Sequence, residues 1–179
     1  MPLISHILDQ RRGQVIDVGP NLGQSLLKFK AVDRERGYIA FEPNNRCCSY
    51  LARLVQCNHI PHCEIYPMAL LDRPGVRQLH SDGATGQGAT IVDGFRNPGF
   101  YGLTETVAGI PLDEFLGYRK PGEIALIKID VEGGEYEVIA GSAGSLRELR
   151  PFIICEILPV YDESTPAGMQ RRARQDQLL

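Results

Sequence analysis

Residues 14–24, QVIDVGPNLGQ, contain the residue types and spacing most suited to binding a small ligand. An apolar run ends at Asp17. Glycine or asparagine then stands at every second position, as Gly19, Asn21 and Gly23. A helix that follows such a loop presents free backbone N–H groups and the positive end of its dipole. We therefore predict that this loop binds an anionic group of a ligand, with a bare glycine turn as the alternative.

The choice of ligand depends on which positions carry side chains. A dinucleotide fingerprint, Gly-x-Gly-x-x-Gly, needs glycine where Asn21 and Gln24 stand, and no Gly-Lys-Ser/Thr of a P-loop follows. Glu42, expected at the end of the second strand, suits a ribose diol. Asp17 would orient the loop or meet a ligand ammonium. S-adenosylmethionine has a carboxylate, an ammonium and a ribose, and is the cofactor we predict.

Carboxylates at the ends of later apolar runs indicate where chemistry would occur. Asp130 ends one run, Glu132 follows it, and Glu156 lies near the end of the next. Because ligands of open α/β sheets lie at the carboxyl ends of the strands, Asp130 and Glu156 are expected to face one site. Such a pair can share a divalent cation or act as a general base, but no third ligand is evident and we predict no metal. For Glu132 the alternative is an acid at a helix N-terminus.

His80 is a candidate general base, because imidazole titrates near neutral pH. A purely structural histidine is the alternative. We assign Asp130, Glu132 and His80 as the candidate catalytic residues.

Five short runs, apolar on both faces, must position these residues. They are residues 14–19, 37–42, 63–70, 123–130 and 151–157. Helix-periodic segments lie after the first, second and fourth of these runs. This alternation predicts an α/β protein with a doubly wound, mostly parallel sheet.

Residues 74–111 interrupt the alternation. Two short strands, 75–81 and 104–112, are expected to form a hairpin, and the Gly-rich loop 82–103 between them to cover the active site as a lid. We expect one domain over residues 1–179, ending in a helix whose basic cluster QRRARQ is a solvated face. Such a sheet lacks final strands, and its fifth strand is an edge through which a homodimer could form.

Composition restricts partners and location. Lys plus Arg number 19 and Asp plus Glu 22, a net charge of −3 that argues against nucleic-acid binding. Without a signal peptide or the ~20 apolar residues of a membrane span, we expect a cytoplasmic protein that binds no membrane. The five cysteines are expected to be reduced. The segment CNHIPHC (57–63) has zinc-type residues, but its spacing and Pro61 favour a loop running into a strand.

The chain resembles the FkbM family of class I S-adenosylmethionine-dependent methyltransferases. Four stretches carry the resemblance, which covers most of residues 14–157: VIDVGPNLG, FEPN, IPLDEFL and, most specifically, LIKIDVEGGEYEVIAGSAGSLRELRPFIICEI. The resemblance implies a Rossmann-like methyltransferase fold with the cofactor at Asp17, Gly19, Pro20, Asn21, Gly23, Glu42, Pro43, Asn44, Met68 and Ala69. The glycine loop would line the methionine part, Glu42 the ribose and residues 43–44 and 68–69 the adenine. For Met68, core packing is the alternative.

The residues after the fourth strand restrict the class of molecule that could accept the methyl group. Methyltransferases that act on the amino groups of bases often carry the sequence Asn/Asp-Pro-Pro-aromatic at this position. This chain has Asp-Val-Glu-Gly at 130–133 instead. The resemblance implies an O-methyltransferase that acts on a hydroxyl of a small molecule, sugar or glycan. Two alternatives remain: a truncated or non-catalytic domain that binds S-adenosylmethionine or a protein partner, and an NAD-dependent Rossmann oxidoreductase.

Overall fold

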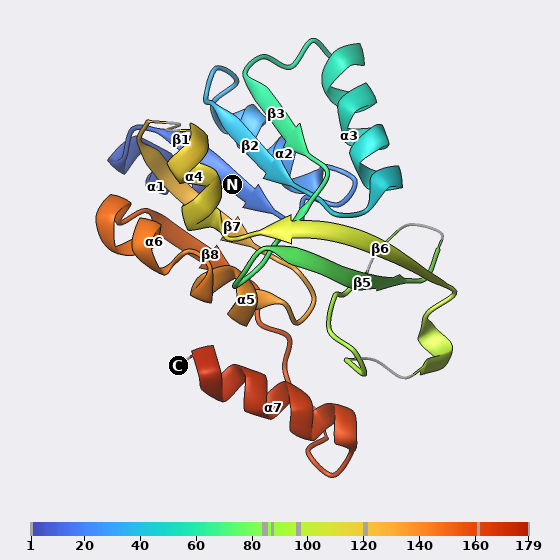
Figure 1. Ribbon diagram of the computed structural model, residues 1–179. Helices are drawn as coiled ribbons and strands as arrows, with labels where there is room; N and C mark the ends of the chain where they lie inside the picture. The colour runs from blue at the N-terminus through green and yellow to red at the C-terminus, as the bar shows by residue number, and fades with distance from the viewer. Residues whose placement is uncertain are drawn as a thin grey trace.

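The central sheet of this computed structural model is five-stranded and entirely parallel (Figure 1). Its strands are β1 (Gln14–Val18), β2 (Tyr38–Phe41), β3 (Cys63–Tyr66), β7 (Ile124–Ile129) and β8 (Phe152–Cys155). They lie in the order β3-β2-β1-β7-β8, so the chain winds outward from β1 in both directions. The predicted doubly wound α/β fold is therefore confirmed. The structure describes residues 2–83, 86, 88–95, 98–119, 122–160 and 162–178.

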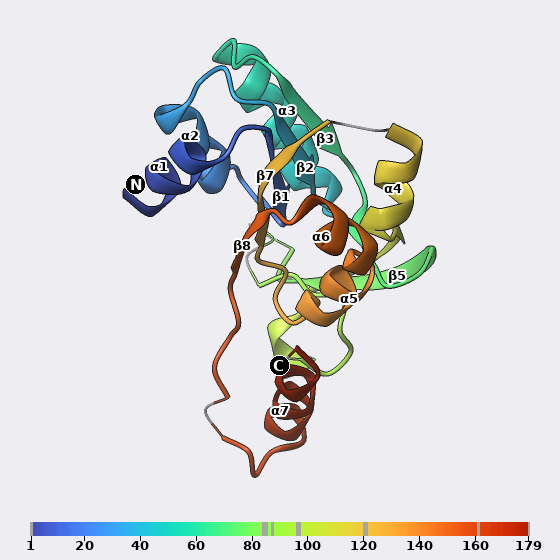
Figure 2. The same cartoon turned by 90° about the vertical axis from the view of Figure 1, so that its left-hand side faces the viewer.

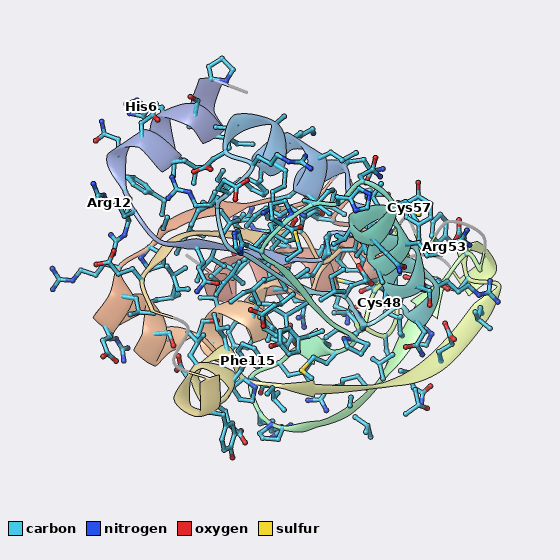
Figure 3. The ribbon with its side chains drawn as sticks, turned by 90° about the horizontal axis from the view of Figure 1, so that it is seen from above. His6, Arg12, Cys48, Arg53, Cys57 and Phe115 are labelled. Atoms are coloured by element: carbon cyan, nitrogen blue, oxygen red, sulfur yellow. The ribbon has the colours of Figure 1, made fainter. Side chains whose placement is uncertain are left out.

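Helices cover both faces of this sheet. One face packs against α1 (Pro2–Gln10), α2 (Gln24–Val32) and α3 (Asn45–Cys57). The other packs against α4 (Leu112–Arg119), α5 (Glu135–Ala140) and α6 (Ala143–Leu149). Figure 3 shows α1 and α2 on one side of the sheet and α4, with Phe115, on the other. In β1, Val15 belongs to the first core and Ile16 to the second, which is why the strand is apolar in both phases.

A second sheet contains β4 (Ala69–Leu70), β5 (Gly75–Ser81) and β6 (Leu103–Ile110), in the order β4-β6-β5. β5 and β6 are antiparallel, which confirms the predicted hairpin, and a 3₁₀ turn, η1 (Pro98–Phe100), lies in the loop between them. β4 pairs with β6 in parallel.

One strand prediction, 63–70, was wrong in its extent. β3 ends at Tyr66, and residues 69–70 pair with β6 of the second sheet instead of continuing along β2. Pro67 has no N–H to donate to a neighbouring strand, and the backbone turns there, with the Met68 N–H donating to the Tyr66 carbonyl at 2.9 Å. The break carries the chain from the central sheet to the second sheet.

The C-terminal helix α7 (Pro166–Leu178) lies apart from the sheet and packs against α5 (Figure 2). The prediction that its basic cluster is a solvated face was wrong for two of its three arginines. Arg171 and Arg174 are partly buried and bind backbone carbonyls of other segments. Arg172 is 55% exposed and pairs with Asp176 at 3.2 Å, one turn along the helix. The loops that α7 meets are distant in sequence, so helical periodicity alone could not reveal this docking.

β8 lies at the edge of the central sheet, as predicted, with Phe152 and Ile153 exposed. Within the described ranges, no helix is long and apolar enough to cross a membrane.

Candidate active site

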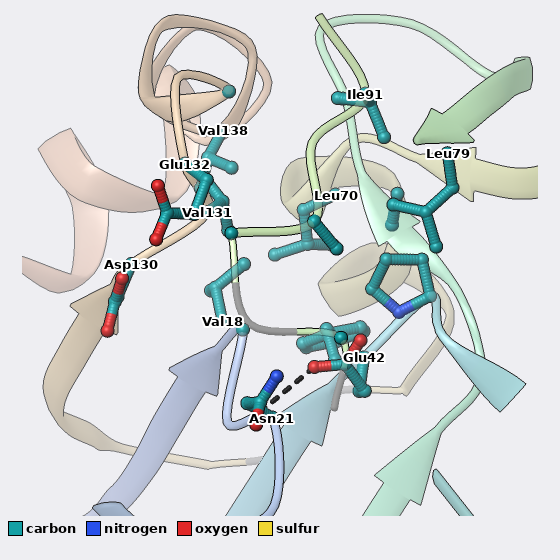
Figure 4. A pocket seen from close by; sticks show the side chains of 18 of the residues that line it. Val18, Asn21, Glu42, Leu70, Leu79, Ile91, Asp130, Val131, Glu132 and Val138 are labelled. Carbon is teal, nitrogen blue, oxygen red and sulfur yellow. Dashed lines mark hydrogen bonds between the residues drawn. The ribbon is translucent and has the colours of Figure 1, made fainter. Parts of the chain in front are cut away.

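A cavity of about 490 Å³ opens at the carboxyl ends of β1, β2 and β7. β1 and β7 are neighbours, yet the chain leaves β1 toward β2 on the opposite side, which makes this the switch point of the sheet. Figure 4 shows Glu42 and Asn21 at the base of the cavity, with Asp130 and Glu132 along one wall. Its volume lies within the range of small-molecule and cofactor sites.

The glycine loop is held closely against the end of β7. Gly19 has a φ of +76°, and a Cβ there would lie 2.0 Å from the Asp130 carbonyl oxygen. Asn21 also has a left-handed φ of 50°. The Lys128 ammonium donates to the Gly19 carbonyl at 3.0 Å. Only glycine fits at position 19, for reasons of both conformation and space.

Glu42 is a buried carboxylate, 5% exposed, that nonetheless lines the cavity. Its carboxylate oxygens accept hydrogen bonds from the Asn21 N–H at 3.0 Å and the Asn44 N–H at 2.9 Å. Burial raises the pKa of Glu42 to about 7, although these two N–H donors oppose the rise. Glu42 thus joins the loop after β1 to the segment after β2.

Asp17 lies beneath the cavity and does not line it. Its fully buried carboxylate accepts from the hydroxyls of Ser25 and Tyr38. The Lys128 ammonium lies 3.2 Å from Asp17 and 3.2 Å from Asp130. Burial lowers the pKa of Lys128, but the two carboxylates outweigh this and hold the pKa above its usual value.

Two roles were considered for Asp17, and the arrangement supports that of orienting the loop. The cation that pairs with the Asp17 carboxylate is Lys128, so a ligand ammonium is not needed there. Sequence reasoning missed Lys128. A single lysine inside the apolar strand IALIKI was the signal that a buried partner exists.

Three further carboxylates line the cavity: Asp130, Glu132 and Glu156. The Asp130 carboxylate, with a smaller effect of burial, raises the pKa of Glu156. β7 and β8 are paired neighbours, which is how Asp130 and Glu156 reach one site, as expected.

Glu132 is carried to the cavity by an unusual turn. It has a φ of 54° and precedes Gly133, whose φ is 100°. α5 begins only at Glu135, whose carboxylate accepts the Gly133 N–H at 3.0 Å. The role of acid at the helix N-terminus therefore belongs to Glu135 rather than to Glu132.

His80 is not brought to this cavity. Its ring contacts the Thr104 hydroxyl at 3.1 Å and the Asp93 carboxylate at 2.8 Å. Leu79, its neighbour on β5, lines the cavity, and side chains alternate between the faces of a strand. The geometry therefore gives no support to His80 as the general base.

Some of the predicted cofactor-binding residues line the cavity and others do not. Besides Asp130 and Glu132, the predicted residues that line the cavity are Gly19, Asn21, Glu42, Pro43 and Ala69. Among the predicted residues, the lining does not include Asp17, Pro20, Gly23, Asn44, Met68 or His80. Gly23 begins α2 against Leu51 and Leu54, the Asn44 side chain caps α3, and Met68 packs on the core, the alternative considered for it.

Apolar lining from the second sheet and its loop escaped the sequence-based prediction. Leu79 comes from β5, and Ala89, Ile91 and Phe100 come from the described part of loop 82–103. Figure 4 shows Leu79 and Ile91 across the cavity from Asp130 and Glu132. The loop lies over the carboxyl edge of the sheet, where a lid was expected.

Potential metal ligands are scattered over the described residues. That part of the chain contains no group of three or more His, Cys, Asp or Glu side chains that could hold a metal ion. In the 57–63 segment, Cys57 is exposed at the end of α3, and the His62 ring lies 3.4 Å from the Glu35 carboxylate.

Comparison with known proteins identifies the family. No curated protein matches the chain. The model of the methyltransferase FkbM domain matches residues 17–172, which include the glycine loop, Glu42 and the Asp130–Glu132 segment. The chain therefore belongs to the FkbM methyltransferase family.

Proposed function

We propose that the protein transfers a methyl group from S-adenosylmethionine to a hydroxyl of a small molecule, sugar or glycan. The observation that carries this proposal is Glu42, a buried carboxylate that lines the cavity beside the glycine loop at the switch point of the sheet. Membership of the FkbM family supports methyl transfer. The residues of the cavity wall support the choice of cofactor and acceptor.

The residues present fit this cofactor. A carboxylate has about four acceptor sites, and two backbone N–H groups use only part of that capacity in Glu42. Ribose hydroxyls would donate to the remainder. Pro43 and Ala69 offer an apolar wall for adenine, and the left-handed loop around Asn21 suits the methionine end. Asn21, whose side chain stands where pyrophosphate needs none, disfavours the NAD alternative.

When bound, S-adenosylmethionine supplies a methyl group on a sulfonium, so the protein must mainly orient the acceptor and exclude water. Asp130 is held by Lys128, and the neighbouring Asp130 carboxylate raises the pKa of Glu156. We assign this pair to accept the proton of the acceptor hydroxyl. Glu132 would orient the acceptor, and Leu79 and Ile91 would exclude water.

The charge of the cavity favours an uncharged or amine-bearing acceptor. The charged groups among its described lining residues are four carboxylates: Glu42, Asp130, Glu132 and Glu156. A phosphorylated or carboxylated acceptor would be repelled by them.

A labelled-methyl transfer assay tests the proposal. The full chain is incubated with S-adenosylmethionine carrying a labelled methyl group and with neutral sugars, amino sugars or sugar phosphates. We expect label in neutral or amino sugars only, and loss of about 100-fold in rate for Glu156→Gln. The exposed Glu148→Ala is the control. Transfer to amines alone, or an unaffected Glu156→Gln, would contradict the assignment.

A second candidate function rests on β8. Its position at the sheet edge and the exposed side chains of Phe152 and Ile153 favour pairing with another copy of the chain. This pairing is compatible with catalysis, and it would also suit a non-catalytic interaction domain.

A further inference from the structure

α7 contacts loops of the candidate active site as well as α5. The chain leaves the edge strand β8, runs away from the sheet, and returns as α7 beside α5 (Figures 1 and 2). Its arginines meet two separate segments of the cavity wall: the turn 131–134 and the loop segment 88–95. Neither Arg171 nor Arg174 belongs to the two apolar cores of the central sheet.

Arg174 holds the turn. Its Nε donates to the Gly133 carbonyl at 2.8 Å, and its guanidinium pairs with Glu137 on α5. Both side chains of this pair are largely buried, at 20% and 18% exposure, so solvent screens them less than a surface pair. The residues on either side of Gly133, Glu132 and Gly134, line the cavity.

The turn needs holding because its backbone is in an unfavourable conformation. Glu132 has a φ of 54°, a region that residues with a Cβ rarely adopt. From the inner side, the Glu135 carboxylate accepts the Gly133 N–H at 3.0 Å. From the outer side, Arg174 binds the Gly133 carbonyl. The two peptide groups that follow Glu132 are therefore both hydrogen-bonded to side chains.

The same helix binds the loop segment 88–95, part of which lines the cavity. The Arg171 guanidinium donates to the Phe95 carbonyl at 2.9 and 3.2 Å and lies 4.5 Å from the centre of the Phe95 ring. The Gln170 amide donates to the Asp93 carbonyl at 2.9 Å. Phe95 is itself packed on the turn, since a Cβ on Gly133 would lie 2.4 Å from its ring. Loop and turn thus meet at Phe95 beneath α7.

We propose that Arg174 and Arg171 are positioning residues, and that α7 straps the turn bearing Glu132 to the loop bearing Ala89 and Ile91. The catalytic part of this proposal rests on the proposed methyltransferase function. No described contact joins Arg174 or Arg171 to Glu42 or Asn21, which are assigned to the ribose and the methionine end of the cofactor. Loss of the strap should therefore impair orientation of the acceptor more than binding of the cofactor.

Hydrogen–deuterium exchange of the free full-length protein tests the strap without any activity. In Arg174→Ala, amides of residues 88–95 and 130–135 are expected to exchange about tenfold faster. In Arg171→Ala, the change should be larger in 88–95. The control is Arg172→Ala, which removes an exposed arginine of the same helix. Peptides from β7 should stay protected in all variants, which verifies folding. Equal exchange in Arg174→Ala and Arg172→Ala would overturn the proposal.

Kinetics then separate positioning from folding. For Arg174→Ala, kcat should fall about tenfold, while the Kd for S-adenosylhomocysteine changes by less than about threefold. Arg174→Lys, which keeps the charge but not the two-sided guanidinium contact, should recover part of kcat. An unchanged kcat, or an equal loss in Arg172→Ala, would overturn the catalytic part. If the wild type binds no S-adenosylhomocysteine, the proposed function fails, and the exchange experiment still decides the strap.

Discussion

Glu42, the residue that we propose binds the ribose, is a buried carboxylate whose ionisation opposes folding. Its carboxylate is buried and has a pKa of about 7, compared with 4.5 for an ordinary glutamate. The folded protein therefore holds a proton over a pH range in which the unfolded chain has released it. Burial follows from the position of this carboxylate, which binds both the loop after β1 and the segment after β2, where we propose that the cofactor binds.

The first prediction concerns the pH dependence of stability. Because folding raises the pKa of Glu42, its contribution to the free energy of unfolding is fully present below about pH 4.5 and is lost as pH rises toward 7. At about 1.4 kcal/mol per pH unit, the loss is roughly 3 kcal/mol. Urea unfolding across this range should show the decline in the wild type and a smaller decline in Glu42→Gln. Parallel curves for the two proteins would contradict the prediction.

A second prediction concerns two glycines with opposite requirements. Gly19→Ala forces a Cβ to within 2.0 Å of the Asp130 carbonyl at a φ of +76°, and should destabilise the protein by about 1–3 kcal/mol. Gly117 lies within α4, and no described atom would come within 4 Å of a Cβ added there, so Gly117→Ala should stabilise the protein by about 0.5–1 kcal/mol. Thermal unfolding measures both changes. Equal effects of the two substitutions would show that the loop is not held as described.

Among the helices and strands, β7 contributes both to the two apolar cores and to the candidate active site. Its apolar side chains fill the two cores, while Lys128 reaches between Asp17 and Asp130 and binds the Gly19 carbonyl. The positions of Glu42 and Asp130 could be predicted from the sequence, since each follows an apolar run directly. The pairing of Lys128 with Asp17 could not be predicted, because it depends on the register in which β1 pairs with β7.

The third prediction removes that buried cation. Lys128→Met keeps the length of the side chain but leaves the fully buried Asp17 without its positive partner. Breaking a buried ion pair in this way should cost about 3–5 kcal/mol. Urea unfolding at neutral pH measures the loss, with the exposed Lys28→Met as the matched control. A loss no greater than that of the control would contradict the structural role of the pair.

Over the whole molecule, the parts that escaped prediction are those assembled from distant segments. The doubly wound arrangement of a mostly parallel sheet follows from alternating strands and helices, and was predicted. The side chains of Leu79, Ile91 and Phe100 enter the cavity only because β5 and its loop fold over the central sheet. Arg171 and Arg174 have a helical spacing that reads as a solvated face until their distant partners are known. Periodicity reports the face of an element but does not report which segments that face meets.

The fourth prediction concerns the association of whole molecules. In the described part of the chain, no strand pairs with the outer edge of β8, and Ile153 is 44% exposed. We expect a dimer in sedimentation experiments, dissociated by Ile153→Lys. Val76→Lys, at an exposed apolar site on β5, is the control and should leave the dimer intact. A monomer at all concentrations would exclude pairing through β8.

Calorimetric titration with S-adenosylhomocysteine decides whether this cavity binds S-adenosylmethionine through Glu42. At about pH 8, where Glu42 is ionised, the wild type should bind saturably, and Glu42→Ala about 10–100-fold more weakly. Glu148→Ala, exposed on α6, should bind like the wild type, and NAD should not bind. Binding of NAD instead, absence of binding, or equal affinity in Glu42→Ala would contradict the proposed role of Glu42.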